Sequence, residues 1–383
     1  MNLNLQNNLF YDKVISAWDV NIYVNLDSAI TAKIRKLIFI NYRSFNLAQQ
    51  KIGISRKTLS SICQGNFTNV ANIFKIKNFF ALNNNYVERH IEYFRDSKTG
   101  AYNRTYLNIF PVKISPIMIR IVTHLIGDGS VYPGRLWYGQ KSELKYFNSL
   151  IHSLLKPIKK LNINSYYKQG INNNLLKFHE MNLPMIFGKL VINFLDINLL
   201  DLKKHVYIEK LLLLPKLYRV QALAALYVDE GSISTKTIRM KDKEIVESIG
   251  KLMDTLNYPR SEVTKSFDDC YGISMHSEGF IKFYDDINYC IKKYKNNALG
   301  LWHKNKFAKA KVDSIDISLL KSKKESELLR VKILDILKNR EFIYFYQLRE
   351  MLKIGEDRLY YLLNCLIKRQ KVTRLSYGKY SLR

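Results

Sequence analysis

The chain has 383 residues, 47% of them hydrophobic, which is enough apolar material for more than one core and predicts two to four domains. Its 61 Lys and Arg against 33 Asp and Glu give a formal net charge of +28, which favours a polyanionic partner; we expect no membrane and no small-molecule substrate. The four cysteines form no Cys-x-x-Cys pair and the N-terminus has no signal-peptide pattern, so neither a disulfide framework nor a zinc knuckle is indicated and the expected location is intracellular, in the cytoplasm or nucleoid.

The N-terminal region, 1–110, is predicted to be helical, with an all-α helix-turn-helix at about 28–82. Its first 27 residues are asparagine-rich and uninformative. A short helix around Leu47 and Ala48, a turn at Gly53 and a second helix from Ser55 to Gln64 resemble the helix-turn-helix of phage repressors. Leu59 and Ile62 would point inward. The residues expected to face the major groove are Arg56, Lys57, Ser60 and Gln64.

Two apolar stretches further along the chain end in the same way. The first, PIMIRIVTHLIGDGS, runs from Pro116 to Ser130, and the second, PKLYRVQALAALYVDEGS, runs from Pro215 to Ser232. A proline suits the first turn of each helix and a glycine suits the stop, so each helix is predicted to end with acids in its last turn. Carboxylates are disfavoured by the helix dipole there, which suggests a bound cation. Both stretches are too short to cross a bilayer.

The two stretches belong to a longer repeat. Aligning the closing glycines pairs Asp128 with Glu230, which lie 102 residues apart. Downstream, Gln140 pairs with Lys241 at a separation of 101 residues, and His179 pairs with His276 at 97 residues. A period this constant indicates two copies of one unit, at 111–205 and 206–301.

With motifs IVTHLIGDG and LAALYVDEG at matched spacing, the sequence resembles the LAGLIDADG homing endonucleases in their single-chain, two-motif form, from about Val112 to Leu301. The resemblance implies an α+β fold in which two αββαββα units with curved antiparallel sheets form a pseudo-twofold pair. It also implies that the two motif helices pack together and that Asp128 and Glu230 bind Mg2+, the expected cofactor. Phosphodiester hydrolysis fits such a site, because a metal can stabilise both the attacking and the leaving oxygen.

Some positions depart from the family pattern. Gly127, Ala224 and Ala225 are small, as expected where the motif helices touch, but Thr123 is larger and Asp229 is charged. Asp229 is therefore a third candidate metal ligand, a surface residue or a sign of a displaced site. Where the family often has a lysine at a strand end, this chain has His179 and His276, candidate bases or proton relays beside the candidate catalytic residues Gln140 and Lys241.

Strand side chains alternate between a helix-facing and a DNA-facing side of each sheet. Polar residues on these strands are candidate contacts to DNA grooves or phosphates, although most polar strand residues are merely solvated. The candidates are Tyr166, Tyr167, Lys168, Gln169, Lys177, Arg239 and Lys265.

The C-terminal part is predicted to begin with a basic linker at 302–321, which overlaps the basic tract Lys292 to Lys311; this tract is either a solvated tether or a phosphate contact. From Ser322 to Arg383, three helical patterns and a hairpin turning at Tyr377-Gly378 resemble a winged helix-turn-helix, which binds either DNA or protein.

These features predict a site-specific double-strand DNA endonuclease of the intron-homing type. We expect a monomer, because one chain supplies both motifs. Two alternatives stay open: a non-cleaving transcription regulator built on a LAGLIDADG-like domain, and an intron RNA maturase.

Overall fold

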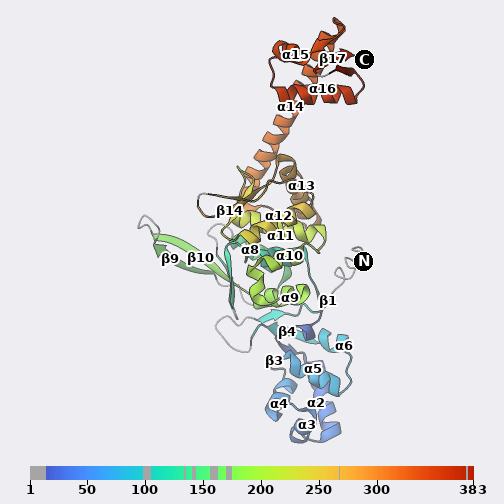
Figure 1. Ribbon diagram of the computed structural model, residues 1–383. Helices are drawn as coiled ribbons and strands as arrows, with labels where there is room; N and C mark the ends of the chain where they lie inside the picture. The colour runs from blue at the N-terminus through green and yellow to red at the C-terminus, as the bar shows by residue number, and fades with distance from the viewer. Residues whose placement is uncertain are drawn as a thin grey trace. The chain divides into compact units, whose positions relative to one another are not determined.

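The computed structural model describes residues 14–97, 105–132, 135–139, 144–155, 163–169, 175–266, 268–376 and 378–383 (Figure 1). Helices and antiparallel sheets alternate along the chain, so the fold is α+β. The chain divides into two compact units, Met1–Lys309 and Ala310–Arg383.

The N-terminal region is a mixed structure. Its helices are α2 (Ser28–Tyr42), α3 (Phe45–Ile52), α4 (Arg56–Cys63), α5 (Val70–Phe79) and α6 (Asn84–Arg89), with the 3-10 helix η1 at Ala17–Asp19. Its strands are β1 (Val14–Ile15), β2 (Tyr23–Leu26), β3 (Thr68–Asn69), β4 (Ile91–Arg95), β5 (Thr105–Leu107) and β6 (Val112–Lys113).

The prediction that this region is all-α is therefore wrong. Four of the strands form a sheet in the order β3-β2-β4-β5. Val24 and Leu26 of β2 are buried and alternate with less buried neighbours, the period of two that a strand satisfies and a helix does not. The buried Ile91 and Phe94 of β4 are three residues apart, where the pairing with β2 shifts in register. β1 pairs with β6, which joins the region to the strand before the first motif.

The central region contains the predicted element order twice. The first copy comprises α7 (Pro116–Thr123), β7 (Gly129–Tyr132), β8 (Arg135–Tyr138), α8 (Leu144–Leu154), β9 (Ile163–Gln169), β10 (Leu175–Leu183), α9 (Met185–Leu195) and η2 (Leu199–Lys203). After α10 (His205–Leu211), the second comprises α11 (Lys216–Glu230), β11 (Gly231–Ser232), β12 (Thr237–Met240), α12 (Lys243–Thr255), β13 (Thr264–Lys265), β14 (Tyr271–Ser274), α13 (Ser277–Tyr294), η3 (Asn297–Leu299) and η4 (Trp302–Lys304).

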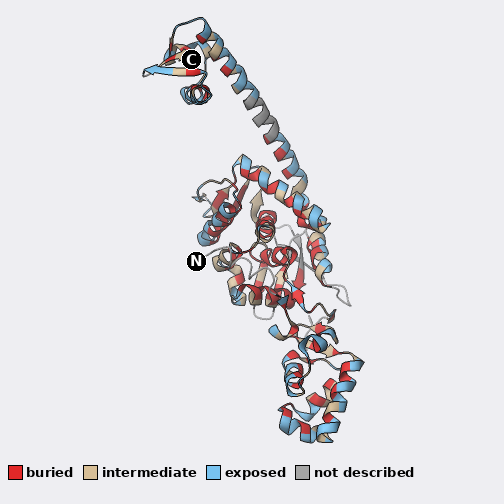
Figure 2. Ribbon diagram, turned by 90° about the vertical axis from the view of Figure 1, so that its right-hand side faces the viewer, coloured by how far each residue is buried: buried red, intermediate tan, exposed pale blue. Residues whose placement is uncertain are grey.

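Each copy has one four-stranded sheet, in the orders β7-β8-β10-β9 and β11-β12-β14-β13. The motif helices α7 and α11 pack against each other, and no other helix pair in the described part of the chain makes more extensive contact. Every residue from Val220 to Val228 is buried, as the apolar pattern predicts, and Figure 2 shows the central helices mostly in the colour of buried residues.

The two motif helices end differently. α11 continues to Glu230 as predicted, with Pro215 as its N-cap. The prediction that the first helix continues to Asp128 is wrong, because α7 stops at Thr123. The amides of Leu125 and Ile126 donate to the carbonyls of residues three positions earlier, which tightens the chain into turns before β7.

The C-terminal unit contains α14 (Asn305–Lys338) from Ala310 onward. It continues with β15 (Ile343–Tyr344), α15 (Phe345–Leu352), α16 (Glu356–Lys368), β16 (Val372–Ser376) and β17 (Lys379–Leu382), in the sheet order β15-β17-β16. Ile333, Leu348, Leu359, Leu363 and Tyr380 lie in its own core. The segment predicted as a basic linker, 302–321, begins with the buried Trp302 and continues as part of α14 from Asn305.

Candidate active site and nucleic-acid interface

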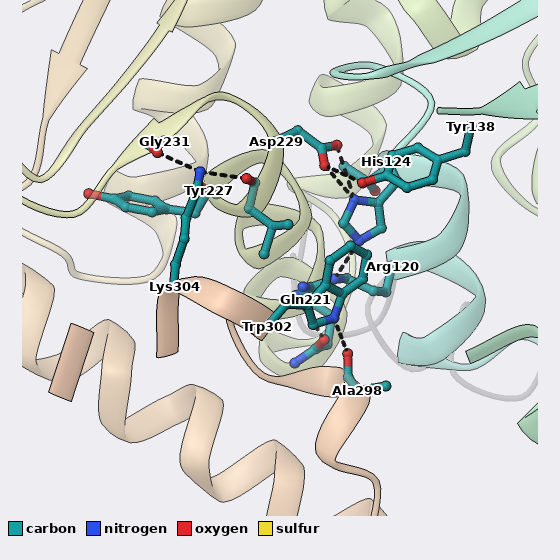
Figure 3. Close-up of polar contacts among 12 residues, drawn as sticks. Arg120, His124, Tyr138, Gln221, Tyr227, Asp229, Gly231, Ala298, Trp302 and Lys304 are labelled. Carbon is teal, nitrogen blue, oxygen red and sulfur yellow. Dashed lines mark hydrogen bonds and ion pairs between the residues drawn. The ribbon is translucent and has the colours of Figure 1, made fainter. Parts of the chain in front are cut away.

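A buried hydrogen-bond network joins the two motif helices (Figure 3). The Arg120 Nε donates to the His124 Nε2 at 2.9 Å, and Arg120 has no exposed surface. Because a guanidinium only donates, the His124 Nε2 is an acceptor and its Nδ1 carries the hydrogen. That Nδ1 donates to both Asp229 carboxylate oxygens at 3.0 Å, and the Tyr138 hydroxyl donates to Oδ1 at 3.0 Å. The network therefore connects α7, α11 and β8.

The Asp229 side chain has 0% exposed surface. Burial raises the pKa of its carboxyl to about 8, against the opposing effects of the Tyr138 hydrogen bond and the charges of Arg120 and Lys304. Burial, together with the charge of Arg120, holds the pKa of His124 well below 6.5, so the imidazole is neutral. The sequence left Asp229 as a ligand, a surface residue or a sign of a displaced site, and the structure places it inside the protein.

Gly127 and Thr123 lie where the two motifs meet, and the neighbours of each explain its residue type. A Cβ added to Gly127 would lie 2.5 Å from the Asp229 Cβ, so the close approach of the two motif ends requires glycine. The Thr123 hydroxyl donates to the Ile119 carbonyl at 2.7 Å and therefore accepts from the Tyr207 hydroxyl at 2.8 Å. Thr123 is thus accommodated by a hydrogen bond from α10.

Two lysines that the sequence analysis missed hold the motif ends. The Lys203 Nζ donates to the carbonyls of Leu125, Ile126 and Gly129 at 2.7, 2.9 and 3.0 Å. The Lys304 Nζ donates to the carbonyls of Tyr227, Val228 and Gly231 at 3.1, 2.5 and 2.6 Å. Each carbonyl of the first set lies 102 residues before its counterpart, and the lysines themselves are 101 residues apart. The repeat period that paired Asp128 with Glu230 was therefore the signal that could have found them.

The carboxylates at the motif ends lie close to this pair of lysines. The charges of Glu230, Asp229 and Asp128 all act on the Lys203 ammonium, whose pKa is nevertheless lowered by burial. Burial, and next the Asp229 carboxylate, raise the pKa of Glu230 even though Lys203 and Lys304 oppose this. A raised pKa marks a carboxylate whose charge is incompletely compensated, which a bound cation would relieve.

The carboxylates at the motif ends suit Mg2+ better than a metal ion that is coordinated by protein side chains alone. Within the part of the chain that the structure describes, no three His, Cys, Asp or Glu side chains converge to hold a metal ion. Mg2+ commonly binds through one or two carboxylates and completes its shell with water and substrate phosphate. Asp128 and Glu230, partly buried at neighbouring motif ends, fit that arrangement.

The strand register separates the two predicted histidines. Gly129 pairs with Tyr138, which pairs with Met181, whereas Gly231 pairs with Ile238, which pairs with Ile273. Met181 is therefore equivalent to Ile273, and His179 is equivalent to Tyr271 rather than to His276. The predicted equivalence fails because β10 has nine residues and β14 only four.

His276 is exposed and occupies the N-cap position of α13 without a side-chain capping bond, beyond the end of β14 that lies beside Thr237. Glu230 ends α11 and precedes Gly231, which pairs with Ile238 and through it aligns with Ile273. His276 lies three residues beyond Ile273, roughly 10 Å along the strand and in the direction away from Glu230. This argues against a catalytic role for His276. Lys241 is exposed and follows directly after β12, at the opposite end of that strand from Thr237 and therefore on the side nearer to Glu230. Gln140 lies outside the described residues.

The predicted DNA contacts on the sheets are placed only in part. Arg239 on β12 and Lys265 on β13 are exposed, and the Lys265 Nζ lies 2.9 Å from the Asp269 carboxylate. Tyr166, Tyr167, Lys168, Gln169, Lys177 and His179 lie on the paired strands β9 and β10, and their side chains are outside the described part of the structure.

Helix α4 has the features that the sequence predicts. Gly53 adopts a left-handed φ of 71°, and the Ser55 hydroxyl caps the helix by accepting from the Thr58 amide at 3.2 Å. Leu59 and Ile62 are buried, while Arg56, Lys57 and Gln64 are exposed. A groove of about 580 Å³ is lined by Arg56, Lys57, Ser60, Ser61, Gln64 and Asn66. The surface is basic, polar and open, as a contact to nucleic acid requires.

Across the described residues, the search for a helix with the length and apolar character of a membrane span finds none.

No protein-family model matches the sequence, and no curated protein matches it. Several solved structures resemble parts of this chain. One is a variant of I-DmoI in complex with its target DNA in the presence of magnesium. It is 17% identical, and the match covers 45% of this chain and 96% of that chain with a TM-score of 0.31. The homing endonuclease I-WcaI bound to its DNA recognition sequence is 12% identical, covering 46% of this chain and 83% of that one with a TM-score of 0.33. Full-length DUF199/WhiA from Thermatoga maritima is 10% identical, covering 67% of this chain and 93% of that one with a TM-score of 0.33.

Proposed function

We propose that the protein is a site-specific, magnesium-dependent double-strand DNA endonuclease of the LAGLIDADG homing type. The observation that carries the proposal is the paired arrangement at the ends of the two motifs. Two acids, Asp128 and Glu230, lie at equivalent positions, and Lys203 and Lys304 bind equivalent carbonyls beside them. Two cleavage centres, one for each strand, need such a duplicated site.

In this proposal the two halves are related by a pseudo-twofold axis between α7 and α11, and one chain acts as a monomer. Asp128 and Glu230 would hold Mg2+, which when bound supplies charge stabilisation for the attacking and leaving oxygens and lowers the pKa of water. Lys203 and Lys304 hold the carbonyls around each acid and place positive charge where the phosphate would approach. The exposed Lys241, which follows β12 on the side nearer to Glu230, would contact a phosphate.

DNA recognition would involve the two sheets, through side chains such as Arg239 and Lys265, and helix α4. Arg56, Lys57, Ser60 and Gln64 line one face of α4 that faces away from its buried Leu59 and Ile62. The net charge of +28 supports a polyanionic partner and supplies long-range attraction to a duplex.

The test is cleavage of a plasmid that carries the uninterrupted insertion locus of the gene, in the presence of Mg2+. We expect Asp128→Asn and Glu230→Gln to bind this site as tightly as the wild type and to lose double-strand cleavage, leaving at most nicks. Ca2+ should support binding with little hydrolysis. If Asp229→Asn alone stops cleavage, the second ligand is Asp229 and the assignment of Glu230 is wrong.

A second candidate function is that of a DNA-binding regulator that does not cut. The observation that favours it is the exposed groove on α4, together with a C-terminal unit of three helices and a hairpin, since cleavage requires neither. A wild type that binds the locus tightly and never cuts it in Mg2+ would establish this function in place of the nuclease.

A further inference from the structure

Trp302 has a backbone conformation that its side chain does not favour. Its φ is +52°, in the left-handed region that bulky residues seldom adopt and that persists only where the surroundings enforce it. Trp302 opens the turn η4, which ends at Lys304. Building on the proposed function, we propose that Trp302 is a positioning residue for the second cleavage centre: with Arg120 and His124 it holds Lys304 against the end of α11.

Three contacts fix the Trp302 ring. It is nearly parallel to the His124 ring, with centroids 4.5 Å apart and an interplanar angle of 22°, and to the Tyr146 ring at 5.7 Å and 12°. Its Nε1 donates to the Ala298 carbonyl at 2.7 Å, a bond drawn in Figure 3. The ring is therefore held by residues of α7, α8 and η3, which explains how the strained backbone is maintained.

Arg120 connects the same turn to the first motif. Its Nη2 donates to the Gly300 carbonyl at 2.9 Å, two residues before Trp302, while its Nε donates to His124 and His124 donates to Asp229. These groups are buried, so breaking one bond would leave its partner without a hydrogen bond, which is costly. A continuous chain of bonds thus runs from the turn to the residue next to Glu230.

Lys304 links the position of the turn that contains Trp302 to the position of Glu230. An ammonium has three hydrogens, and here each has a carbonyl acceptor, Tyr227, Val228 or Gly231, on either side of Glu230. The Tyr227 and Val228 carbonyls lie in the last turn of α11, where the helix dipole favours a cation; Tyr227 also accepts from the Gly231 amide, and the Gly231 carbonyl directly follows the helix. Moving Lys304 would therefore move the backbone that carries Glu230.

The first motif end is held differently. Asp201 lies 101 residues before Trp302, at the matching position of η2. Its carboxylate accepts from the Asn198 amide at 3.2 Å and from the Lys204 Nζ at 3.1 Å, which are local contacts. Lys203 is thus placed by its own turn, whereas Lys304 depends on a network that crosses between the motifs. Damage to Trp302 should consequently affect one centre and spare the other.

The experiment compares Trp302→Leu with Lys304→Met and Lys203→Met on an end-labelled duplex containing the insertion locus. Lys304→Met should leave one strand of the duplex intact. We expect Trp302→Leu to slow the cleavage of that same strand by about a hundredfold, because misplacement near reacting groups has an effect of this size. The other strand should be cut normally. Trp302→Phe, which keeps a ring, should restore most of the lost rate. Trp18→Leu, a matched exchange in the N-terminal region, should leave the ratio of the two strand rates unchanged. Equal slowing of both strands by Trp302→Leu would overturn the inference.

Hydrogen exchange measured by mass spectrometry tests the positioning without relying on cleavage. Trp302→Leu should speed exchange in the segment 227–232 at the end of α11 and leave unchanged the segment 125–130, which follows the His124 that Trp302 stacks on. Equal changes in both segments, or none in either, would overturn the inference. A wild type that shows the expected exchange pattern but cuts no DNA would overturn only the proposed function.

Discussion

The Asp229 carboxyl gives the protein a pH-sensitive buried group. In the unfolded chain its pKa is near the ordinary value of 3.8, and burial raises it to about 8 in the folded protein. Between these values the folded state binds the proton more tightly, so the stability that this group contributes is full below the lower pKa and is lost as the pH rises through the higher one.

We therefore predict that the free energy of unfolding of the DNA-free, metal-free protein falls as the pH rises from about 5 to about 8, by at most about 1.4 kcal/mol per pH unit. Asp229→Asn, which does not ionise, should reduce this slope, and the raised pKa of Glu230 contributes the part that remains. Urea unfolding at a series of pH values measures both. Identical slopes for the wild type and Asp229→Asn would contradict the assignment.

At the scale of secondary-structure elements, different residues of α4 serve stability and DNA contact. Ser55 caps the helix through its hydroxyl, so Ser55→Ala should lower the stability of the N-terminal region by about 1 kcal/mol. Lys57 is exposed on the same helix and lines its groove, so Lys57→Ala should leave stability unchanged.

For DNA binding we expect a different pattern from these two variants. Lys57→Ala should weaken binding to all duplexes similarly and reduce the salt slope of log K by about 1, because one phosphate contact is lost. Thermal unfolding and binding at several salt concentrations distinguish the variants. If Lys57→Ala leaves affinity and salt slope intact, α4 does not contact DNA.

At the scale of the whole molecule, the excess of positive charge is distributed over both compact units. Arg349, Lys353, Arg358, Lys368, Arg369 and Arg374 are all exposed in the C-terminal unit. Each phosphate that the protein neutralises contributes a slope of about −0.9 to log K against log salt. The steepness of the salt dependence thus reports how many modules touch DNA.

Deleting Ser322–Arg383 should lower that slope if the C-terminal unit binds DNA. The remaining chain should keep its fold, because the cores of the two units are separate. Filter binding or anisotropy across salt concentrations measures the slope, and circular dichroism verifies the fold. An unchanged slope and affinity would assign the C-terminal unit to contacts with protein.

The sequence alone determined the features that depend on local patterns. The apolar run at Ala222–Val228 predicted a fully buried helix, Ser55 predicted a cap, and the repeat period located Asp128 and Glu230 at matching motif ends. Each of these follows from side-chain polarity and spacing within a short segment, which do not need distant partners. The presence of two copies of one unit followed from the repeat period, whereas the order of strands and helices within each copy came from the family resemblance.

Tertiary structure decided everything that depends on which distant groups meet. Lys203 and Lys304 look like ordinary surface lysines in the sequence, yet each binds carbonyls more than 70 residues away. The burial of Asp229 requires His124 and Tyr138 from the other half of the chain. The early end of α7 and the separation of His179 from His276 depend on turn geometry and strand length. Long-range hydrogen bonds and register arise only when the chain folds, because they are set by packing between segments and not by the composition of either one.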